Sequence, residues 1–328
     1  MAYTIYDVIT PDLLKNTLLV GVSLVDPGTG LPFPDELFEE AIKQAISVVE
    51  SDLGIKLADF RIKGERHDAF AQNRRSWWSM QVDHRPLKSV NKLTISYGNY
   101  PETDVPLEWV NITSDVGGSV SLIPTAAVLG AFNFSNSIPL LIDPISNFSY
   151  HERVPAYFKY EYRAGFNFLE GTITIPAGET ESADIELIEN LVDTPNFKFE
   201  IIDDGGNNLI TTVKAFDLSN NSFKVSLNDV GVTDVVIGYK LHTLPMAIVK
   251  SVLYIAGMLP LDTAGDLLAG AGIGQFSVGV DGLSQSISTT ASATSAGYGA
   301  RIGSYTKQLE KTMSALRNKY TAPKVAVF

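Results

Sequence analysis

The sequence contains no cysteine, only four histidines and no apolar segment long enough to cross a bilayer. The absence of cysteine excludes disulfides, thiolate metal sites and cysteine nucleophiles. The longest apolar run, Met246 to Leu259, contains Lys250 and is followed by Pro260, so it falls short of the ~20 residues that a transmembrane helix needs. The first residues are not basic and include Asp7 and Asp12, so we expect no cleaved secretion signal.

The composition is typical of a folded protein. Hydrophobic residues make up 45% and charged residues 19% of the 328 positions, which is too apolar for a disordered chain. A chain of this length is expected to form about two domains. The net charge is −12, and such an acidic protein is poorly suited to wrap DNA tightly, although DNA can pass close to it without sticking.

Known catalytic motifs are also missing. The sequence has no phosphate-binding loop, no Gly-x-Ser-x-Gly elbow and no His-Glu-x-x-His pair. Gly297-Tyr298-Gly299 is similar to the start of a dinucleotide-binding loop, but Ile302 stands where that loop needs its third glycine. We therefore expect no catalytic residue and no cofactor, and we expect that the protein is not an enzyme. We also expect no metal site, because the histidines are not spaced like metal ligands; they are His67, His84, His151 and His242.

Two helices are predicted in the first part of the chain. Thr10-Pro11-Asp12 begins a short helix that extends to about Val22. A longer helix runs from Asp35 to Leu53, where acidic residues fill the first turns and Gly54 ends it. Its apolar positions recur at helical spacing and are Phe38, Ala41, Ile42, Ala45, Ile46, Val49 and Leu53.

Two further helices are predicted near the C-terminus. The first begins at Pro245, is apolar on almost every side and is predicted to end at Pro260. The second runs from about 296 to 319 and is followed by a short apolar tail. Its apolar positions lie near heptad spacing and are Tyr298, Ile302, Tyr305, Leu309, Met313, Leu316 and Tyr320.

The remaining segments alternate with a period of two, which is typical of strands. In residues 58–168 the expected strands are 76–82, 89–97, 108–112, 119–123 and 155–162. In residues 169–242 they are 172–175, 183–188, 197–202, 209–213, 223–227 and 235–241. The regular short spacing of this second group suggests an immunoglobulin-like sandwich. Asp281-Gly282 further predicts a hairpin that joins 276–280 to 283–287.

Together these patterns predict an α+β protein with one insertion. A helical body with a small β unit, residues 1–168 and 243–328, is interrupted by an all-β sandwich at residues 169–242, and the chain ends in a long helix with an extended tail. The insertion also differs in charge, because it carries 13 acidic residues against four lysines, a net of −9. Residues 243–328 carry a net charge of +3.

One segment has the composition of an interface. Between Arg61 and Arg85 the sequence combines six basic residues with Trp77-Trp78. Basic and aromatic residues together can face nucleic acid, but tryptophan and arginine are also enriched in the centres of protein interfaces. Because the chain is acidic overall, we favour a protein interface over nucleic acid.

Many of these features occur in the same order in the head-to-tail connector proteins of tailed bacteriophages, also called neck adaptor or head-completion proteins. The sequence resembles them over about residues 30–168 and 243–320. In the first part the similar segments are the helix 37–53, Trp77-Trp78, His84-Arg85-Pro86, the strand 90–98, Glu108-Trp109-Val110, 154–157 and 164–166. In the second part they are Asp262-Thr263-Ala264-Gly265-Asp266, 281–287 and Thr294-Ser295-Ala296-Gly297-Tyr298-Gly299-Ala300-Arg301-Ile302, followed by Tyr305 and a basic helix.

The resemblance implies a dodecameric ring beneath the portal that connects the phage head to the tail and extends the DNA channel. The implied partners are other copies of the chain, the portal protein, a tail-side neck or tail-completion protein, and genomic DNA that passes without sequence-specific binding. The implied location is the virion neck, with the host cytoplasm during assembly. As candidate interface residues we select Trp77, Trp78, Arg85, Tyr298, Arg301, Tyr305 and Phe328.

Two other functional classes remain open. In the resembling proteins the strand that ends near Phe168 leads almost directly into the helix that here begins near Pro245, so the sandwich departs from the compact pattern. The chain is alternatively a binding module or adhesin that uses residues 169–242 to recognise a glycan or a protein. A hydrolase that uses carboxylates such as Asp203 and Asp204 is the weakest alternative, because a hairpin turn explains both residues.

Overall fold

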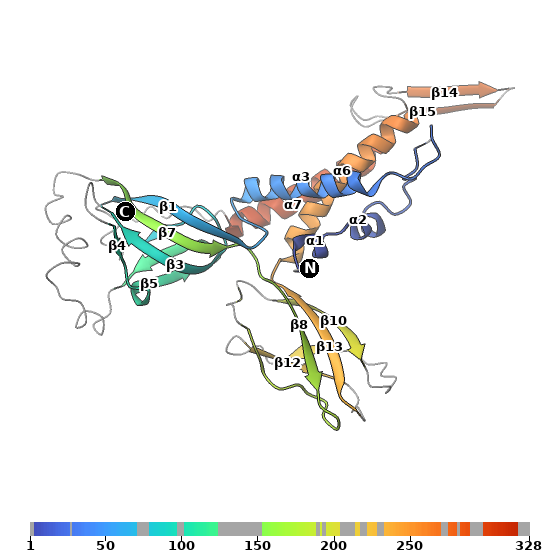
Figure 1. Ribbon diagram of the computed structural model, residues 1–328. Coiled ribbons are helices and arrows are strands. Elements are labelled where there is room, and N and C mark those ends of the chain that lie inside the picture. Colours follow the sequence, from blue (N-terminus) through green and yellow to red (C-terminus); the bar gives the residue numbers. More distant parts are fainter. Residues whose placement is uncertain are drawn as a thin grey trace, which may run out of the picture. The chain divides into compact units, whose positions relative to one another are not determined.

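The protein has an α+β fold, seen in a computed structural model (Figure 1). The structure describes residues 3–26, 28–70, 79–96, 102–123, 153–187, 191, 195–203, 214–216, 222–227, 233–269, 275–280, 283–288 and 298–320. The chain divides into two compact units. The β unit comprises residues 1–3, 54–244 and 322–328, and the helical unit comprises residues 4–53 and 245–321.

The helical unit contains α1 (Ile5–Val8), α2 (Pro11–Thr17), α3 (Asp35–Leu53), α6 (Met246–Ala269) and α7 (Gly299–Tyr320). The prediction for α3 is confirmed: the helix has the expected bounds, and the seven apolar positions named above are its buried residues. Gly54 follows it with φ +61°, a left-handed conformation that glycine adopts without steric cost. α2 is shorter than predicted, because the chain leaves the helix after Thr17 and turns at Gly21, which has φ +76°.

The prediction that the apolar helix ends at Pro260 is wrong. α6 continues through Pro260 to Ala269. A proline inside a helix removes one backbone donor and crowds the preceding turn, but the following turn is held in place because Leu261 and Ala264 are buried. Residues Met246–Leu267 are therefore long and apolar enough to cross a membrane by length and composition, although half of this apolar window is buried inside the protein. α6 packs against α3 and α7, as expected of a central helix in a bundle.

The last helix confirms the heptad-like pattern in part: four of the seven predicted positions are buried, Ile302 and Leu309 are half-buried, and Tyr298 precedes the helix. α7 buries Tyr305, Met313, Leu316 and Tyr320. Arg317 on its exposed side makes a bidentate ion pair with Asp52 of α3, with N–O distances of 2.8 to 3.2 Å. The predicted hairpin is also present, and it consists of β14 (Gln275–Val280) and β15 (Leu283–Ser288).

The first part of the β unit consists of two antiparallel sheets around one core. One sheet has the order β1 (Phe60–Phe70), β7 (Arg153–Ala164), β3 (Leu87–Ile95) and β4 (Thr103–Asp104). The other has the order β2 (Met80–Gln81), β6 (Ser119–Leu122) and β5 (Val110–Ser114), and the one-turn helix η2 (Leu107–Trp109) precedes β5. The common core includes Tyr157, Phe158, Tyr160, Tyr162 and Trp109, all of them at most 2% exposed.

The sequence did not predict β1, although it pairs with β7 along almost its whole length. Its residues are mostly polar, and only Ile62 and Ala69 are fully buried. Two irregularities in the pairing, at Gly64 and Asp68, further break the alternation. A period-two search therefore passes over this strand.

The second part of the β unit is built from the strands of residues 168–242, and we name it the sandwich. One sheet has the order β10 (Asn196–Asp203), β13 (Val235–His242) and β8 (Phe168–Ile175), and the other β11 (Lys214–Phe216), β12 (Ser222–Ser226) and β9 (Ile185–Glu186). Phe223, Val225, Ile175 and Ile237 belong to the core that they share. Five of the six predicted strands thus correspond to observed ones, and the predicted strand 209–213 lies outside the described residues.

The two ends of the sandwich meet at its base. Phe168 at the start of β8 pairs with His242 at the end of β13, and their rings stack 6.3 Å apart. Immediately outside this pair, the buried Asn167 and Thr243 exchange backbone and side-chain hydrogen bonds of 3.0 to 3.2 Å. The chain therefore enters and leaves the sandwich at neighbouring positions.

Candidate functional site

Two of the candidate interface residues hold the helical unit together. Tyr305 is 8% exposed, and its hydroxyl donates to the backbone oxygen of Leu18. Arg301 donates to that hydroxyl and to the backbone oxygen of Val20, both over 2.9 Å. The two side chains thus fix the start of α7 against the segment that follows α2. Tyr298, in the turn before α7, is half-buried.

Arg85 is placed inside the β unit, before a cis peptide bond to Pro86. Its backbone oxygen accepts from the N–H of Lys56 over 2.6 Å. Its half-buried side chain lies so close to Gly118 that an added Cβ there would come within 2.6 Å of it. Burial lowers the pKa of the Arg85 guanidinium. Trp77, Trp78 and Phe328, the other three candidates, lie outside the described residues.

The helical unit has a groove between α3, α6 and α7 that sequence reasoning did not find. Its volume is about 860 Å³, and its apolar lining includes Val48, Ile255 and Met313. The Asp52–Arg317 ion pair lies along it. Val48 is not one of the seven buried apolar positions of α3, and its side chain is 51% exposed. The groove needs side chains from three helices, which no sequence pattern brings together.

The same unit exposes apolar side chains beyond the groove. Such residues occur on α6 and in the segments around α2, and each is at least 38% exposed: Tyr6, Val20, Val25, Leu31, Met246, Leu259 and Leu267. Scattered exposed apolar residues are normal in proteins. Together with the apolar groove they are a candidate surface for contact with another molecule.

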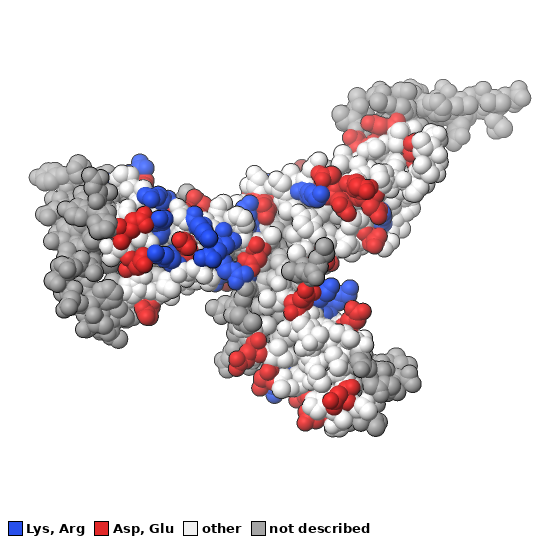
Figure 2. Space-filling view, viewed as in Figure 1, with Lys and Arg blue, Asp and Glu red and all other residues white. Residues whose placement is uncertain are grey.

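The solvent face of the four-stranded sheet carries a network of ion pairs. Lysines and arginines alternate there with acidic residues over β1 and β7 (Figure 2). The pairs on this face are Arg61–Glu161, Arg66–Glu102, Lys159–Glu102, Arg163–Asp59 and Lys92–Asp104. The buried Lys88, whose side chain is 3% exposed, also pairs with Asp59. Five basic residues meet four acidic ones in these exposed pairs, and the exposed Lys63 adds a further positive charge on β1, so basic residues outnumber acidic ones here although the whole chain is acidic.

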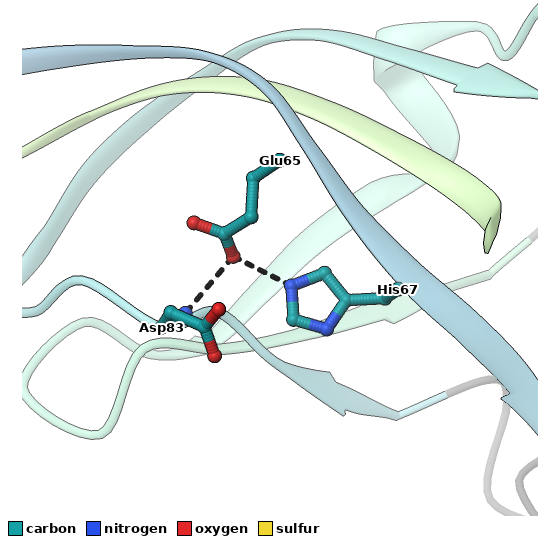
Figure 3. A group of neighbouring side chains, drawn as sticks. All are labelled: Glu65, His67 and Asp83. Carbon is teal, nitrogen blue, oxygen red and sulfur yellow. Dashed lines mark hydrogen bonds and ion pairs between the residues drawn. The ribbon is translucent and has the colours of Figure 1, made fainter.

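Beside this face, Glu65, His67 and Asp83 form a cluster of polar side chains (Figure 3). Glu65 and His67 come from β1, and Asp83 follows β2. Glu65 Oε1 lies 2.5 Å from His67 Nε2 and accepts the backbone N–H of Asp83 over 2.9 Å. Its other oxygen accepts the Tyr162 hydroxyl. The signal for this cluster is Glu-x-His on one strand, which sequence reasoning missed because it did not predict β1.

The electrostatics of the cluster keep Glu65 ionised. Burial alone raises the pKa of this carboxyl, which is 8% exposed, but hydrogen bonds from His67, Tyr162 and the Asp83 backbone outweigh burial and lower its pKa below 4.5. Burial, and then the hydrogen bond to Glu65, raise the pKa of Tyr162. The phenol therefore stays a donor and the carboxylate stays an acceptor.

The sandwich has a shallow hollow of about 300 Å³ along β8, β10 and β13. Charged side chains from neighbouring strands line it, and they are Glu170, Lys198, Glu200 and Lys240. Gly238 and Ile202 also line the hollow. The absence of a side chain at Gly238 leaves room there, because an added Cβ would lie only 3.1 Å from the side chain of Ile202. This arrangement offers hydrogen bonds and charge to a polar ligand.

No protein-family model matches the sequence, and no curated protein matches it.

Proposed function

We propose that the chain is a structural virion protein that forms a ring beneath the portal and connects the phage head to the tail. The observation that carries this proposal is the resemblance to head-to-tail connector proteins, which runs in order through residues 30–168 and 243–320 and is closest in the segments 262–266, 281–287 and 294–302. In this proposal the ring is a dodecamer that extends the DNA channel, and the protein is not an enzyme.

The helical unit supports an assembling role. A subunit of a closed ring contacts its two neighbours through two different surfaces. The groove between α3, α6 and α7 and the exposed apolar residues around α2 and α6 provide apolar area for such contacts. Burying apolar surface contributes roughly 25 cal/mol per Å², so side chains such as Val48, Leu259 and Leu31 are stabilising when a neighbouring subunit covers them.

The base of the sandwich supports the proposed insertion. We propose that residues 1–168 and 243–328 form the adaptor body and that residues 169–242 are an inserted immunoglobulin-like domain. Pairing of Phe168 with His242 brings the two junctions together, and the sandwich has an apolar core of its own. A domain whose ends meet is tolerated as an insertion, because the host structure needs only a short connection there.

The charge distribution fits this arrangement. The sandwich carries a net charge of −9 and residues 243–328 carry +3. An acidic insert on the outside of a ring keeps particles apart in solution. The basic C-terminal segment is the part that we propose to contact the portal protein, while a tail-side protein binds the opposite side of the ring and DNA passes through it.

Electron microscopy of purified virions tests the proposal. We expect the chain in the neck, as a ring between portal and tail. Absence of the chain from the neck contradicts the proposal. As a matched pair, Val48→Asp places a charge in the groove and Gln44→Asp places one on an exposed polar position of the same helix. The first variant should reduce joining of heads to tails while it remains folded, and the second should not.

The sandwich hollow favours a second candidate function, a binding module that recognises a glycan or protein through β8, β10 and β13. Deletion of residues 169–242 with a short connection between Phe168 and Thr243 separates the two functions. An adaptor with this deletion should still join heads to tails, whereas an adhesin should lose binding to its target. Lys198→Ala and Lys240→Ala are smaller tests of the hollow itself.

A further inference from the structure

We propose that Glu65, His67 and Asp83 form a binding site for one divalent transition-metal ion, with Zn²⁺ as the representative ion. The proposal does not depend on the head-to-tail function. One side-chain ligand atom from each of the three residues lies within 4.8 Å of the other two, and Figure 3 shows the Glu65 and Asp83 carboxylates on the same side of the His67 ring.

The strand geometry places the ligands together. Side chains two positions apart on a strand point to the same side, so Glu65 and His67 of β1 are neighbours. The pairing irregularity between Lys63 and Glu65 turns them away from the solvent face that carries Arg61 and Lys63. The backbone N–H of Asp83 donates to Glu65 over 2.9 Å, and this bond holds the third ligand beside the other two.

The donor set fits a transition ion. One imidazole nitrogen and two carboxylate oxygens are ligands that Zn²⁺ accepts, with water in the fourth position of a tetrahedron. Mg²⁺ and Ca²⁺ prefer oxygen ligands alone, so His67 favours Zn²⁺, Co²⁺ or Mn²⁺ over them. Asp83 is exposed, which leaves an entry path for the ion and for its water ligand.

Neighbouring residues orient the ligands. The Tyr162 hydroxyl donates to the Glu65 oxygen that does not face His67, and the Tyr160 ring meets the His67 ring edge to face at 5.6 Å. Among the described residues, the side-chain carboxylate of Asp83 has no hydrogen bond or ion pair. Two ligands are therefore held in place, while the third carboxylate is available to coordinate.

Binding replaces a proton by the ion. In the ion-free protein Nε2 of His67 and Oε1 of Glu65 are 2.5 Å apart and share a hydrogen bond. With ligand distances of about 2.0–2.1 Å, two ligands of a tetrahedral ion stand ~3.3 Å apart, so this pair opens by less than ~1 Å. Nε2 binds the ion through its lone pair, Nδ1 carries the imidazole proton, and any further proton leaves to solvent.

A structural consequence follows from the positions of the ligands. The ion joins β1 to the segment after β2, which leads through Arg85 and the cis-Pro86 into β3. An ion that binds only the folded protein raises its unfolding temperature. The site is therefore proposed as a structural metal site that links two segments of the β unit.

The test uses the full chain without an affinity tag, after dialysis against a chelator. Calorimetry with Zn²⁺ is expected to show one equivalent bound, and Co²⁺ is expected to give the visible absorption of a tetrahedral site. Zn²⁺ should raise the unfolding temperature of the β unit. His67→Gln and Asp83→Asn should each weaken binding by about 10- to 100-fold or more, the range that loss of even a supporting residue causes.

His84→Gln is the matched control, because it removes a histidine next to Asp83 that is not among the three ligands. Circular dichroism verifies that each variant is folded. The proposal is overturned if no equivalent of Zn²⁺ or Co²⁺ binds to the wild-type chain, if the double variant of His67 and Asp83 binds as tightly as the wild type, or if His84→Gln abolishes binding. In the first of these outcomes the cluster is a hydrogen-bonded network only.

Discussion

The two halves of the β unit, β1 to β7 and the sandwich, both consist of antiparallel sheets, but their surfaces differ in the number of ion pairs and in the sign of the excess charge. The solvent face of β1, β7 and β3 carries five ion pairs and an excess of basic residues. In the described part of the sandwich one ion pair is found, Lys224–Asp184 at 3.7 Å, and the region has a net charge of −9. Figure 2 shows mostly acidic side chains over the sandwich strands.

The interiors differ in the same way. In the first half the Tyr162 hydroxyl donates to Glu65 and accepts from the backbone N–H of His84, in a network that joins β1, β7 and the segment after β2, while the buried Tyr160 hydroxyl donates to the sulfur of Met80. The buried core of the sandwich is aliphatic apart from Phe223, and the partly buried Phe197 and Phe199 pack against it. Hydrogen-bonded networks fix the register of strands, whereas apolar cores depend on volume and tolerate substitution. The comparison indicates that hydrogen bonds fix the strand register of the first half, whereas the sandwich has its own apolar core and an acidic surface that keeps it soluble.

The largest expected effect comes from Phe223→Ala. This side chain is fully buried and contacts the rings of Phe197 and Tyr239. Removing a buried phenylalanine costs about 3–5 kcal/mol of folding free energy, so we expect loss of the sandwich with β1 to β7 intact. Limited proteolysis and amide hydrogen exchange measure this. Phe60→Ala is the control, because Phe60 is 53% exposed on β1. Simultaneous unfolding of both halves would disprove their independence.

The second prediction concerns Glu65→Gln. The substitution keeps the volume but removes the charge that accepts from His67, Tyr162 and the Asp83 backbone. Hydrogen bonds to charged groups contribute about 1.5–3 kcal/mol, and we expect a loss of about 2 kcal/mol, confined to β1 to β7. Glu200→Gln on the exposed face of the sandwich should change stability by less than about 0.5 kcal/mol. Equal effects at both positions would remove the difference between the two halves.

The sequence predicted the parts whose signal is local. α3 has a clear apolar stripe with acidic residues at its start and Gly54 at its end, and each of these can be identified without tertiary structure. β1 could not be predicted, because its burial comes from β7, about 90 residues later in the chain. For the same reason the Glu65–His67–Asp83 cluster and the groove at Val48 remained hidden.

Pro260 shows the opposite case, in which a strong local signal is overridden. Proline normally ends a helix, yet the burial of Leu261 and Ala264 extends α6 beyond it. Of the candidate interface residues, Tyr305 lies on the predicted apolar stripe of the last helix and Arg301 belongs to the segment that carries the resemblance, but neither signal indicates that they contact Leu18 and Val20. Sequence spacing indicates which face of a helix is buried, but it does not indicate which residues that face contacts.

The third prediction is that the folding stabilities of the two halves of the β unit depend differently on pH. Burial lowers the pKa of His242 below 6.5, so the unfolded chain binds a proton that the folded sandwich does not. The stability of the sandwich is then full above pH 6.5 and falls as the pH decreases below it. The pKa of Glu65 is lowered below 4.5, so β1 to β7 lose this contribution only in more acidic solution.

Unfolding followed between pH 4 and pH 8 by hydrogen exchange measures both halves. His242→Phe keeps an aromatic ring against Phe168 and should remove the sandwich's loss of stability just below pH 6.5. If the variant keeps the wild-type pH dependence, another group is responsible.

The smallest expected effect is that of Lys159→Ala. This residue pairs with Glu102 at 3.0 Å on the solvent face of the sheet, and such surface pairs contribute about 0.2–1 kcal/mol. The loss should become smaller at high salt because of screening. Lys224→Ala in the sandwich, with its single longer pair, should have less effect at every salt concentration. Urea unfolding at low and high salt distinguishes the two.

The most direct test of the proposed head-to-tail function is cryo-electron microscopy of purified virions, wild type and with residues 169–242 deleted. The account predicts a ring of this chain between portal and tail in both, with density for the sandwich lost from the ring's outside in the deleted form. Virions in which the chain is absent from the neck, or in which it lies elsewhere on the particle, contradict it.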